Sequence, residues 1–329
     1  MVAIQTGKHR GLQQLADSCG MLAMCAADHR ESLKKMLDAA NPEAVSHEQM
    51  AEFKLDLCRA LGSHASALLL DPIYGAAQAI AAGVLPGRAG LLVSMEATGY
   101  TREDGARISR LLEGWDVRKA KKMGASAAKL LIYFRPDASR AAERQLRLVG
   151  TLAAECLEAD LALLVEVVTY ALEGESPEEF ARLKPQLVIE SARQVSALPI
   201  DVLKIEFPAD LRVEKDEDTL LNLCQELDAA SRTPWVLLSA GVDFEFFRRE
   251  VQIACRAGAS GFLAGRALWQ EASRSPSRAE RFKYFATTAA RRLDMLAAVA
   301  DAYGTPWYAK LGSEDGSFAP APEGWHLSC

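Results

Sequence analysis

Eight short apolar runs alternate along the chain with segments that have the spacing of amphipathic helices. The runs are almost continuously apolar rather than alternating, which is typical of β-strands buried on both faces. Between them, apolar residues recur at spacings of three and four, and charged residues occupy the opposite helix faces. The predicted strands cover residues 21–28, 67–72, 90–96, 127–134, 162–170, 202–208, 235–241 and 261–266.

An eightfold alternation of strand and helix predicts an α/β fold, a (β/α)8 TIM barrel, closed by a long helix from residue 278 to about 303. A doubly wound sheet is the competing architecture, but no Gly-x-Gly-x-x-Gly motif follows the first run. No linker divides the chain, so we predict one barrel domain over residues 1–329, with an N-terminal helix near residues 11–17 and a C-terminal extension from residue 312. Residues 98–114 are expected to form a loop over the barrel mouth.

Composition excludes several classes of function. The net charge of −6 and the lack of a basic stripe argue against nucleic acid or an anionic membrane as a partner. No apolar segment is long enough to span a membrane, and the N-terminus lacks the apolar core of a signal peptide, so a cytoplasmic location is expected. The seven cysteines are scattered without a Cys-x-x-Cys motif, and we expect neither a structural zinc nor a cofactor.

Two lysines lie inside predicted strands, Lys129 in AAKLLIYF and Lys204 in DVLKIEFP. Burial lowers the pKa of an amine and makes it available as a nucleophile, which can attack a carbonyl group. In the alternative interpretation, each amine reaches water at the strand end or pairs with a carboxylate such as Glu166 or Glu206.

Polar residues at the carboxyl ends of the strands favour the catalytic interpretation, because these ends form the active-site floor of such barrels. The charge of Lys129 disfavours a second positive charge nearby, which would favour the free amine at Lys204. A carboxylate across the barrel, such as Glu166, would supply a proton shuttle. The expected ring consists of Asp28, Asp71, Glu96, Lys129, Glu166, Lys204, Ser239 and Arg266.

Two glycine motifs end the last two strands, LLSAGVD at 237–243 and LAGRALW at 263–269. Loops at these places in a barrel often bind phosphate through backbone N–H groups, although turn glycines alone would also explain the motifs. We therefore expect Ser239, Gly241, Gly265 and Arg266 to bind a substrate phosphate. His29, directly after the first strand, either contacts an anionic group of the substrate or caps the next helix.

From about residue 20 to residue 310 the chain resembles the class I tagatose-1,6-bisphosphate aldolases and their sulfofructosephosphate aldolase relatives. The motifs that carry the resemblance are AADHRESLKKML, LLLDPIYG, EATGY, GASAAKLLIYF, LLVEVVTY, IDVLKIEFP, LLSAGV and LAGRALW. The resemblance implies a Schiff base on Lys204, with Glu166, Lys129 and Asp28 as further catalytic residues. It also implies a phosphate held by Ser239 and Arg266, and cleavage of a ketose 1-phosphate such as tagatose 1,6-bisphosphate to dihydroxyacetone phosphate and glyceraldehyde 3-phosphate.

One departure from that family affects the expected substrate. The family usually has Asp-Gln-Arg after the first strand, where this chain has Asp28-His29-Arg30. Sulfofructose 1-phosphate is therefore an alternative substrate, and a non-catalytic, metabolite-sensing barrel is an alternative function. A metal-dependent lyase or isomerase, with Asp28, Glu96 and Glu166 as oxygen ligands, is the rival chemistry. As partners we expect a small sugar phosphate and other copies of the chain in a homo-oligomer.

Overall fold

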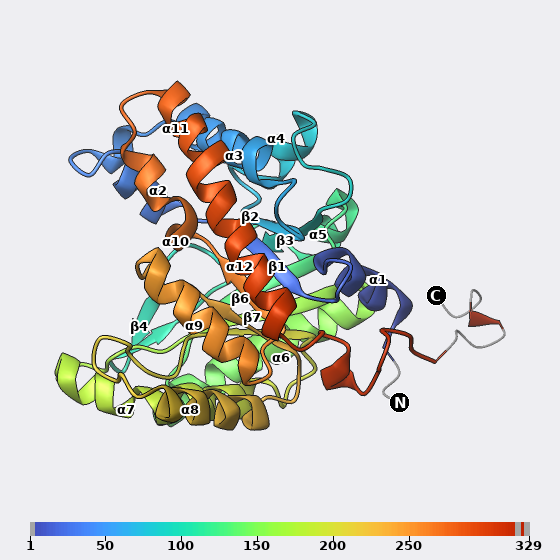
Figure 1. The fold of residues 1–329 in the computed structure, drawn as a ribbon, viewed down its shortest axis with the longest axis vertical. Helices are drawn as coiled ribbons and strands as arrows, with labels where there is room; N and C mark the ends of the chain where they lie inside the picture. Colours follow the sequence, from blue (N-terminus) through green and yellow to red (C-terminus); the bar gives the residue numbers. More distant parts are fainter. Residues whose placement is uncertain (1–3, 320–323, 326–329) are drawn as a thin grey trace.

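The computed structural model describes residues 4–319 and 324–325 and confirms the predicted barrel of parallel strands with helices around it (Figure 1). Its strands close in the order β1-β10-β9-β8-β7-β6-β3-β2. The first strand lies against the last, with Leu22 in register with Gly261 and Cys25 with Ala264. The barrel strands are β1 (Leu22–Ala27), β2 (Ala67–Leu70), β3 (Gly90–Ser94), β6 (Ala127–Tyr133), β7 (Ala162–Val168), β8 (Val202–Ile205), β9 (Trp235–Leu238) and β10 (Gly261–Ala264).

Helices follow the strands and cover the outside of the barrel (Figure 1). The predicted helix over residues 278–303 consists of α11 and α12 joined by a π-helical turn, Phe285–Ala289. The other helices are α1 (Thr6–Leu15), α2 (Glu31–Leu37), α3 (His47–Leu61), α4 (Ala76–Ala81), α5 (Val117–Met123), α6 (Ser139–Glu158), α7 (Pro177–Val195), α8 (Glu217–Ala230), α9 (Phe244–Arg256), α10 (Arg266–Trp269), α11 (Arg278–Tyr284) and α12 (Ala290–Tyr303). Short 3₁₀ turns lie at Pro42–Ala44, Gln270–Arg274 and Ala309–Leu311.

Two apolar clusters result from the alternation of side chains along each strand. The larger cluster joins the outward-facing strand residues to the helices, and the smaller cluster fills the inside of the barrel. Helix α1 adds Leu12 and Leu15 to the inner cluster and closes the amino-terminal end of the barrel. Gly11 allows this close approach, because a Cβ there would lie 2.3 Å from the carbonyl oxygen of Ser126. The inward-facing positions near the carboxyl ends of the strands lie beyond this apolar cluster and carry the polar groups.

The connection after β3 contains a small antiparallel hairpin, β4 (Thr101–Glu103) and β5 (Ala106–Ile108). Of the loop predicted at residues 98–114, Thr98 and Gly99 line the cavity at the barrel mouth, whereas residues 101–108 form the hairpin. The predicted C-terminal extension lies partly outside the described residues, at 320–323 and 326–329. No helix in the described ranges is both long and apolar enough to cross a membrane.

Candidate active site

A cavity of about 580 Å³ opens at the carboxyl ends of the barrel strands. Most of the residues that the sequence predicts for the site line this cavity: Asp28, His29, Lys129, Glu166, Lys204, Ser239, Gly265 and Arg266. Gly241 does not line the cavity itself but packs against Arg266, since a Cβ at Gly241 would lie 3.0 Å from the Cζ atom of that arginine. The structure therefore brings together side chains that are more than 200 residues apart in the sequence.

Strand geometry explains why the ionisable side chains meet inside the barrel. Ala127, Leu164 and Val202 point into the inner apolar cluster. Lys129, Glu166 and Lys204 each lie two residues further along the same strands, so they face the same way but nearer the mouth. Glu166 is in register with Lys204 on the neighbouring strand, and not across the barrel as predicted from the sequence.

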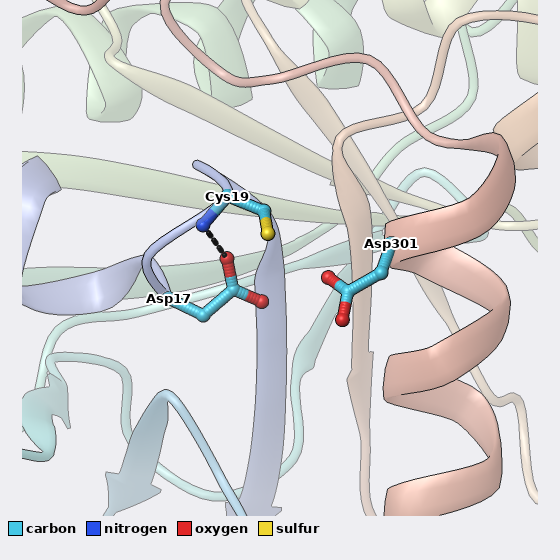
Figure 2. A group of neighbouring side chains, drawn as sticks. All are labelled: Asp17, Cys19 and Asp301. Atoms are coloured by element: carbon cyan, nitrogen blue, oxygen red, sulfur yellow. Dashed lines mark hydrogen bonds between the residues drawn. The ribbon is translucent and has the colours of Figure 1, made fainter.

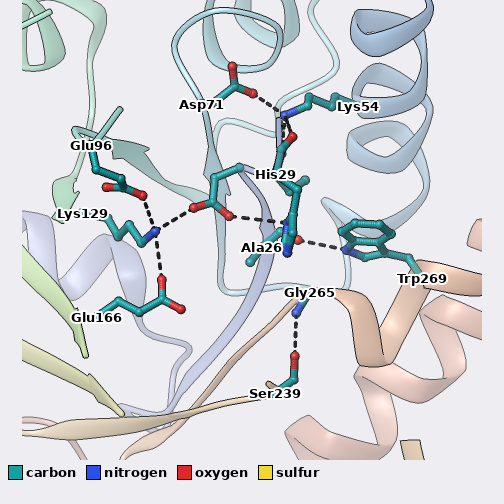
Figure 3. A network of polar contacts seen from close by, with 12 residues as sticks. Ala26, His29, Lys54, Asp71, Glu96, Lys129, Glu166, Ser239, Gly265 and Trp269 are labelled. Atoms are coloured by element: carbon teal, nitrogen blue, oxygen red, sulfur yellow. Dashed lines mark hydrogen bonds and ion pairs between the residues drawn. The ribbon is translucent and has the colours of Figure 1, made fainter. Parts of the chain in front are cut away.

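The amine of Lys129 lies at the centre of three carboxylates (Figure 3). Its Nζ atom is 2.6 Å from Oε1 of Glu96 and 2.8 Å from Oδ2 of Asp28 and from Oε2 of Glu166. The other oxygen of Glu96 accepts a hydrogen bond of 3.0 Å from the backbone N–H of Leu131. Lys129 is therefore held by contacts from β7 and from the segments that follow β1 and β3.

These contacts decide the protonation of the cluster. Burial alone would lower the pKa of Lys129, but the charges of Asp28, Glu166 and Glu96 raise it well above its ordinary value. Burial likewise opposes ionisation of Asp28 and Glu166, yet Lys129 and Lys204 lower the pKa of both carboxyl groups. Lys129 therefore stays positive and the two acids stay negative at neutral pH.

Lys204 has a different environment from Lys129. Its Nζ atom contacts a single carboxylate, with Oε1 of Glu166 at 2.8 Å, while Oε2 of Glu166 contacts Lys129. Glu166 thus bridges the two amines. The repulsion predicted between the two lysines is offset, because Asp28 and Glu96 complete a cluster of two cations and three carboxylates. A proton can pass directly between Lys204 and Glu166, which is the exchange that carbonyl addition by an amine requires.

The carboxylates that a metal-dependent enzyme would use already surround a cation. Asp28, Glu96 and Glu166 converge on the Nζ atom of Lys129, so the position between them is occupied by an ammonium group. The one group of described residues that brings three potential ligand atoms within 4.8 Å of one another lies elsewhere and consists of Asp17, Cys19 and Asp301 (Figure 2). Oδ1 of Asp17 there accepts the backbone N–H groups of Cys19 and Met21, so this carboxylate serves its own loop.

The predicted phosphate-binding residues meet at the ends of β9 and β10. The backbone N–H of Gly265 points to Oγ of Ser239 at 3.5 Å (Figure 3), and Gly241 has a φ of +76°, which favours glycine. A Cβ at Gly265 would lie 2.9 Å from Cε1 of His29, so this glycine lets the histidine ring approach the chain. Arg266 is half-buried on the cavity wall and forms no ion pair with any described residue.

His29 lies in the cavity wall and does not cap a helix. Helix α2 begins at Glu31 after Arg30, and no side chain caps its first turn. The ring of His29 packs edge-on against Trp269, and its Nδ1 atom is buried without a hydrogen-bond partner, 3.7 Å from Oδ1 of Asp28. Burial and the nearby charge of Arg266 lower the pKa of His29 to about 4, against the opposing effect of Asp28. The ring is therefore neutral at pH 7.

One member of the predicted ring belongs to a separate cluster. Asp71 is fully buried and pairs with Lys54 of α3, whose Nζ atom also donates to the carbonyl oxygens of Ala27 and His29 at 2.7 and 2.8 Å (Figure 3). Asp71 and Lys54 thus fix the loop after β1 rather than line the cavity. Conversely, Tyr133 and Glu206 do line it. Both lie an even number of residues after an inward lysine, and this spacing could have identified them from the sequence.

A comparison with protein families identifies the chain. A family model described as DeoC/LacD family aldolase matches residues 22–271. This chain belongs to the DeoC/LacD aldolase family. The aldolase is 32% identical over 289 residues to tagatose 1,6-diphosphate aldolase 1 of Enterococcus faecalis, covering 82% of this chain and 86% of the relative. It is 30% identical over 324 residues to tagatose 1,6-diphosphate aldolase of Lactococcus lactis, covering 92% and 98% of the two chains.

Two solved structures with the same fold carry the name aldolase. The fructose-bisphosphate aldolase of Plasmodium falciparum superposes with a TM-score of 0.72 at 15% identity, covering 92% of this aldolase and 98% of that chain. A Schiff-base-forming fructose-1,6-bisphosphate aldolase gives a TM-score of 0.56 at 18% identity, covering 86% and 98%. At these identities the likeness concerns the fold alone, and the chemistry must come from the side chains of this aldolase.

Proposed function

We propose that this aldolase is a class I enzyme that forms a Schiff base through Lys204 and cleaves a ketose 1-phosphate to dihydroxyacetone phosphate and an aldehyde. The observation that carries the proposal is the contact of 2.8 Å between the Lys204 amine and Glu166 in a cavity otherwise rich in fixed charges. A lysine with one accessible acid partner has both requirements of imine formation, a nucleophile and a proton shuttle. The match to tagatose 1,6-diphosphate aldolases over most of the chain supports a ketose bisphosphate as substrate.

The contacts suggest a role for each group in the reaction. Glu166 takes a proton from the Lys204 amine, which attacks the ketone carbon, and returns a proton as the carbinolamine loses water. Glu166, ionised again after the water leaves, takes the proton of the C4 hydroxyl while the protonated imine accepts the electron pair of the C3–C4 bond, and the aldehyde leaves. Glu166 then returns this proton to C3 of the enamine, and water hydrolyses the resulting imine to release dihydroxyacetone phosphate and the free amine. Lys129 holds Glu166 in place and keeps it ionised before it takes up a proton, and Asp28 in turn holds Lys129.

The phosphate at C1 would bind at the ends of β9 and β10. Arg266 has no ion pair with a described residue, and a guanidinium group can bind phosphate through two parallel hydrogen bonds. The hydroxyl of Ser239 lies beside it in the cavity wall. The backbone N–H of Gly265 faces the same wall, with only a long contact of 3.5 Å to Oγ of Ser239.

His29 favours a second candidate substrate of the same class. As a neutral ring whose buried Nδ1 atom lies toward Asp28, it offers the substrate one hydrogen bond, through Nε2, and no charge. A sulfonate spreads its single charge over three oxygens and requires less positive charge than a phosphate dianion. We therefore keep sulfofructose 1-phosphate beside tagatose 1,6-bisphosphate as the candidate substrate.

A panel assay tests the proposal. Tagatose 1,6-bisphosphate, fructose 1,6-bisphosphate and sulfofructose 1-phosphate would be incubated with the aldolase, and dihydroxyacetone phosphate would be measured by coupled oxidation of NADH. We expect release from at least one of them at a rate that EDTA does not change. Loss of activity in EDTA would favour the metal-dependent mechanism, and release from none would contradict the proposed substrate class. The His29→Gln variant, run on the same panel, would reveal whether this residue sets the ranking of the three sugars.

A further inference from the structure

Glu206 lies on the cavity wall directly above the Lys204 side chain. It follows Lys204 by two residues at the end of β8, so the two side chains face the inside of the barrel at successive levels. Two strand residues span about 6.6 Å, which places Glu206 one level nearer the mouth. The side chain is only 10% exposed and still contributes to the cavity lining.

The two oxygens of Glu206 differ in their contacts. Oε2 accepts the backbone N–H and the hydroxyl of Thr169, both at 2.6 Å, and these bonds fix the carboxylate to the loop after β7. Oε1 lies 3.8 Å from Nζ of Lys184, which is an ion pair but longer than a hydrogen bond. No donor in the described part of the chain bonds to Oε1. Oε1 is not among the fully enclosed polar atoms that lack a partner in the described residues, so it can accept a hydrogen bond from a group in the cavity that Glu206 lines.

The distribution of charge around the cavity indicates what kind of substrate group could donate a hydrogen bond to Oε1 of Glu206. Arg30, Lys35 and Arg266 also line the cavity, and none of them forms an ion pair with a described residue. These cations come from the loop after β1, from α2 and from the start of α10, whereas Glu206 directly follows β8. Anionic groups of a substrate should therefore bind near these cations, and the carboxylate of Glu206 should repel such groups. A neutral hydroxyl group, in contrast, donates a strong, short hydrogen bond to a carboxylate.

We propose that Glu206 is a specificity-determining residue that accepts a hydrogen bond from a hydroxyl group in the aldehyde half of the substrate. The proposal rests on the proposed function, which puts the ketone carbon at Lys204 and the C4 hydroxyl near Glu166, one level below Glu206. The hydroxyl next along the sugar, on C5, then lies at the level of Glu206. In the condensation direction this is the 2-hydroxyl of the incoming aldehyde, so the enzyme selects 2-hydroxyaldehydes as a class.

The condensation reaction allows a direct test. Dihydroxyacetone phosphate would be combined with glyceraldehyde 3-phosphate or with 3-oxopropyl phosphate, which lacks only the 2-hydroxyl group. We expect kcat/KM to favour the hydroxyaldehyde by about 10² or more in the wild-type enzyme, because a site built for a hydroxyl discriminates strongly against its absence. Glu206→Leu should bring that ratio to within about threefold of unity. Glu206→Gln, which keeps the shape and the bonds to Thr169, should lower it by about tenfold and covers the case in which the leucine variant does not fold.

A matched variant separates recognition from structure. Thr169→Val removes one bond to Oε2 and leaves Oε1 unchanged, so it should lower both condensation rates in parallel and keep the wild-type ratio. An unchanged ratio in Glu206→Gln and in Glu206→Leu, with both rates reduced equally, would overturn the proposal and leave Glu206 a structural residue. A wild-type enzyme that condenses neither aldehyde would overturn the proposed function and this inference with it.

Discussion

Replacing Lys129 by methionine tests the charge balance inside the barrel. The change keeps an apolar stem of similar length but leaves the carboxylates of Asp28, Glu96 and Glu166 facing one another without the amine. All three acids are at most 12% exposed in their side chains, so water replaces the lost partner only in small part. The variant should therefore be destabilised, and it should recover stability by taking up protons.

The expected loss follows from the contacts. Removing one partner of a buried ion pair costs about 3–5 kcal/mol, and because Lys129 has three partners we expect about 5 kcal/mol at pH 8. An unfolding entropy of roughly 2.1 cal/mol/K per residue gives about 0.7 kcal/mol/K for a chain of this length. The unfolding temperature should thus fall by about 7 °C.

The pH dependence of this loss has a definite sign. In the wild type, Lys129 lowers the pKa of Asp28 and of Glu166, so the stability that these acids contribute is constant between pH 5 and pH 8. Without Lys129, at least one acid has a folded-state pKa above its unfolded value. Such a group loses its contribution to stability as the pH rises through the folded-state pKa, so the deficit should be larger at pH 8 than at pH 5.

Differential scanning calorimetry of both proteins at the two pH values measures this directly. Lys204→Met is the matched control, because Glu166 keeps its contact with Lys129 there, and its unfolding temperature should fall by less than half as much. An equal deficit for Lys129→Met at pH 5 and pH 8, or none at either, would refute the assignment of Lys129 as the counter-charge of the cluster.

Three further predictions concern single residues. Glu166→Gln should reduce kcat by roughly 10²- to 10⁴-fold with little change in KM, measured by steady-state kinetics, and a change confined to KM would contradict its role as proton shuttle. Arg266→Lys should raise KM for the ketose phosphate at least tenfold, because lysine lacks the two parallel donors, and an unchanged KM would place the phosphate elsewhere. Burial raises the pKa of Glu250 to about 8; the charge of Lys184 opposes this shift and that of Asp210 adds to it. The stability that the protonated Glu250 side chain contributes is therefore fully present below about pH 4.5 and is lost as the pH rises through 8. Glu250→Gln should therefore be more stable than the wild type by about 4 kcal/mol at pH 9 but nearly equal at pH 5 in urea unfolding; the same difference at both pH values would contradict this.

The barrel could be predicted because its strands are buried on both faces. That burial makes each strand a continuous apolar run, and a charged residue within such a run, as at Lys129, Glu166 or Lys204, is conspicuous. Strand ends were harder to define, because predicted strands such as residues 202–208 continue into loops that are still partly apolar, while β8 ends at Ile205.

Pairing between side chains could not be predicted, because it depends on tertiary packing. Asp71 lies at the end of a predicted strand, as the site residues do, but its side chain forms an ion pair with Lys54 of α3 and does not line the cavity. The net charge around Lys129 likewise depends on Glu96, which lies beyond the end of β3 in a single antiparallel bridge to Leu111, a pairing that the sequence does not reveal. His29 could have been a helix cap until the structure placed the start of α2 at Glu31.

Trapping of the covalent intermediate tests the central proposal most directly. The enzyme would be incubated with dihydroxyacetone phosphate and sodium borohydride, which reduces an imine to a stable amine, and then digested and examined by peptide mass spectrometry. We predict one adduct, on the peptide that contains Lys204, and none in the Lys204→Ala variant. An adduct on Lys129, or an active enzyme with no adduct at all, would contradict the proposed mechanism.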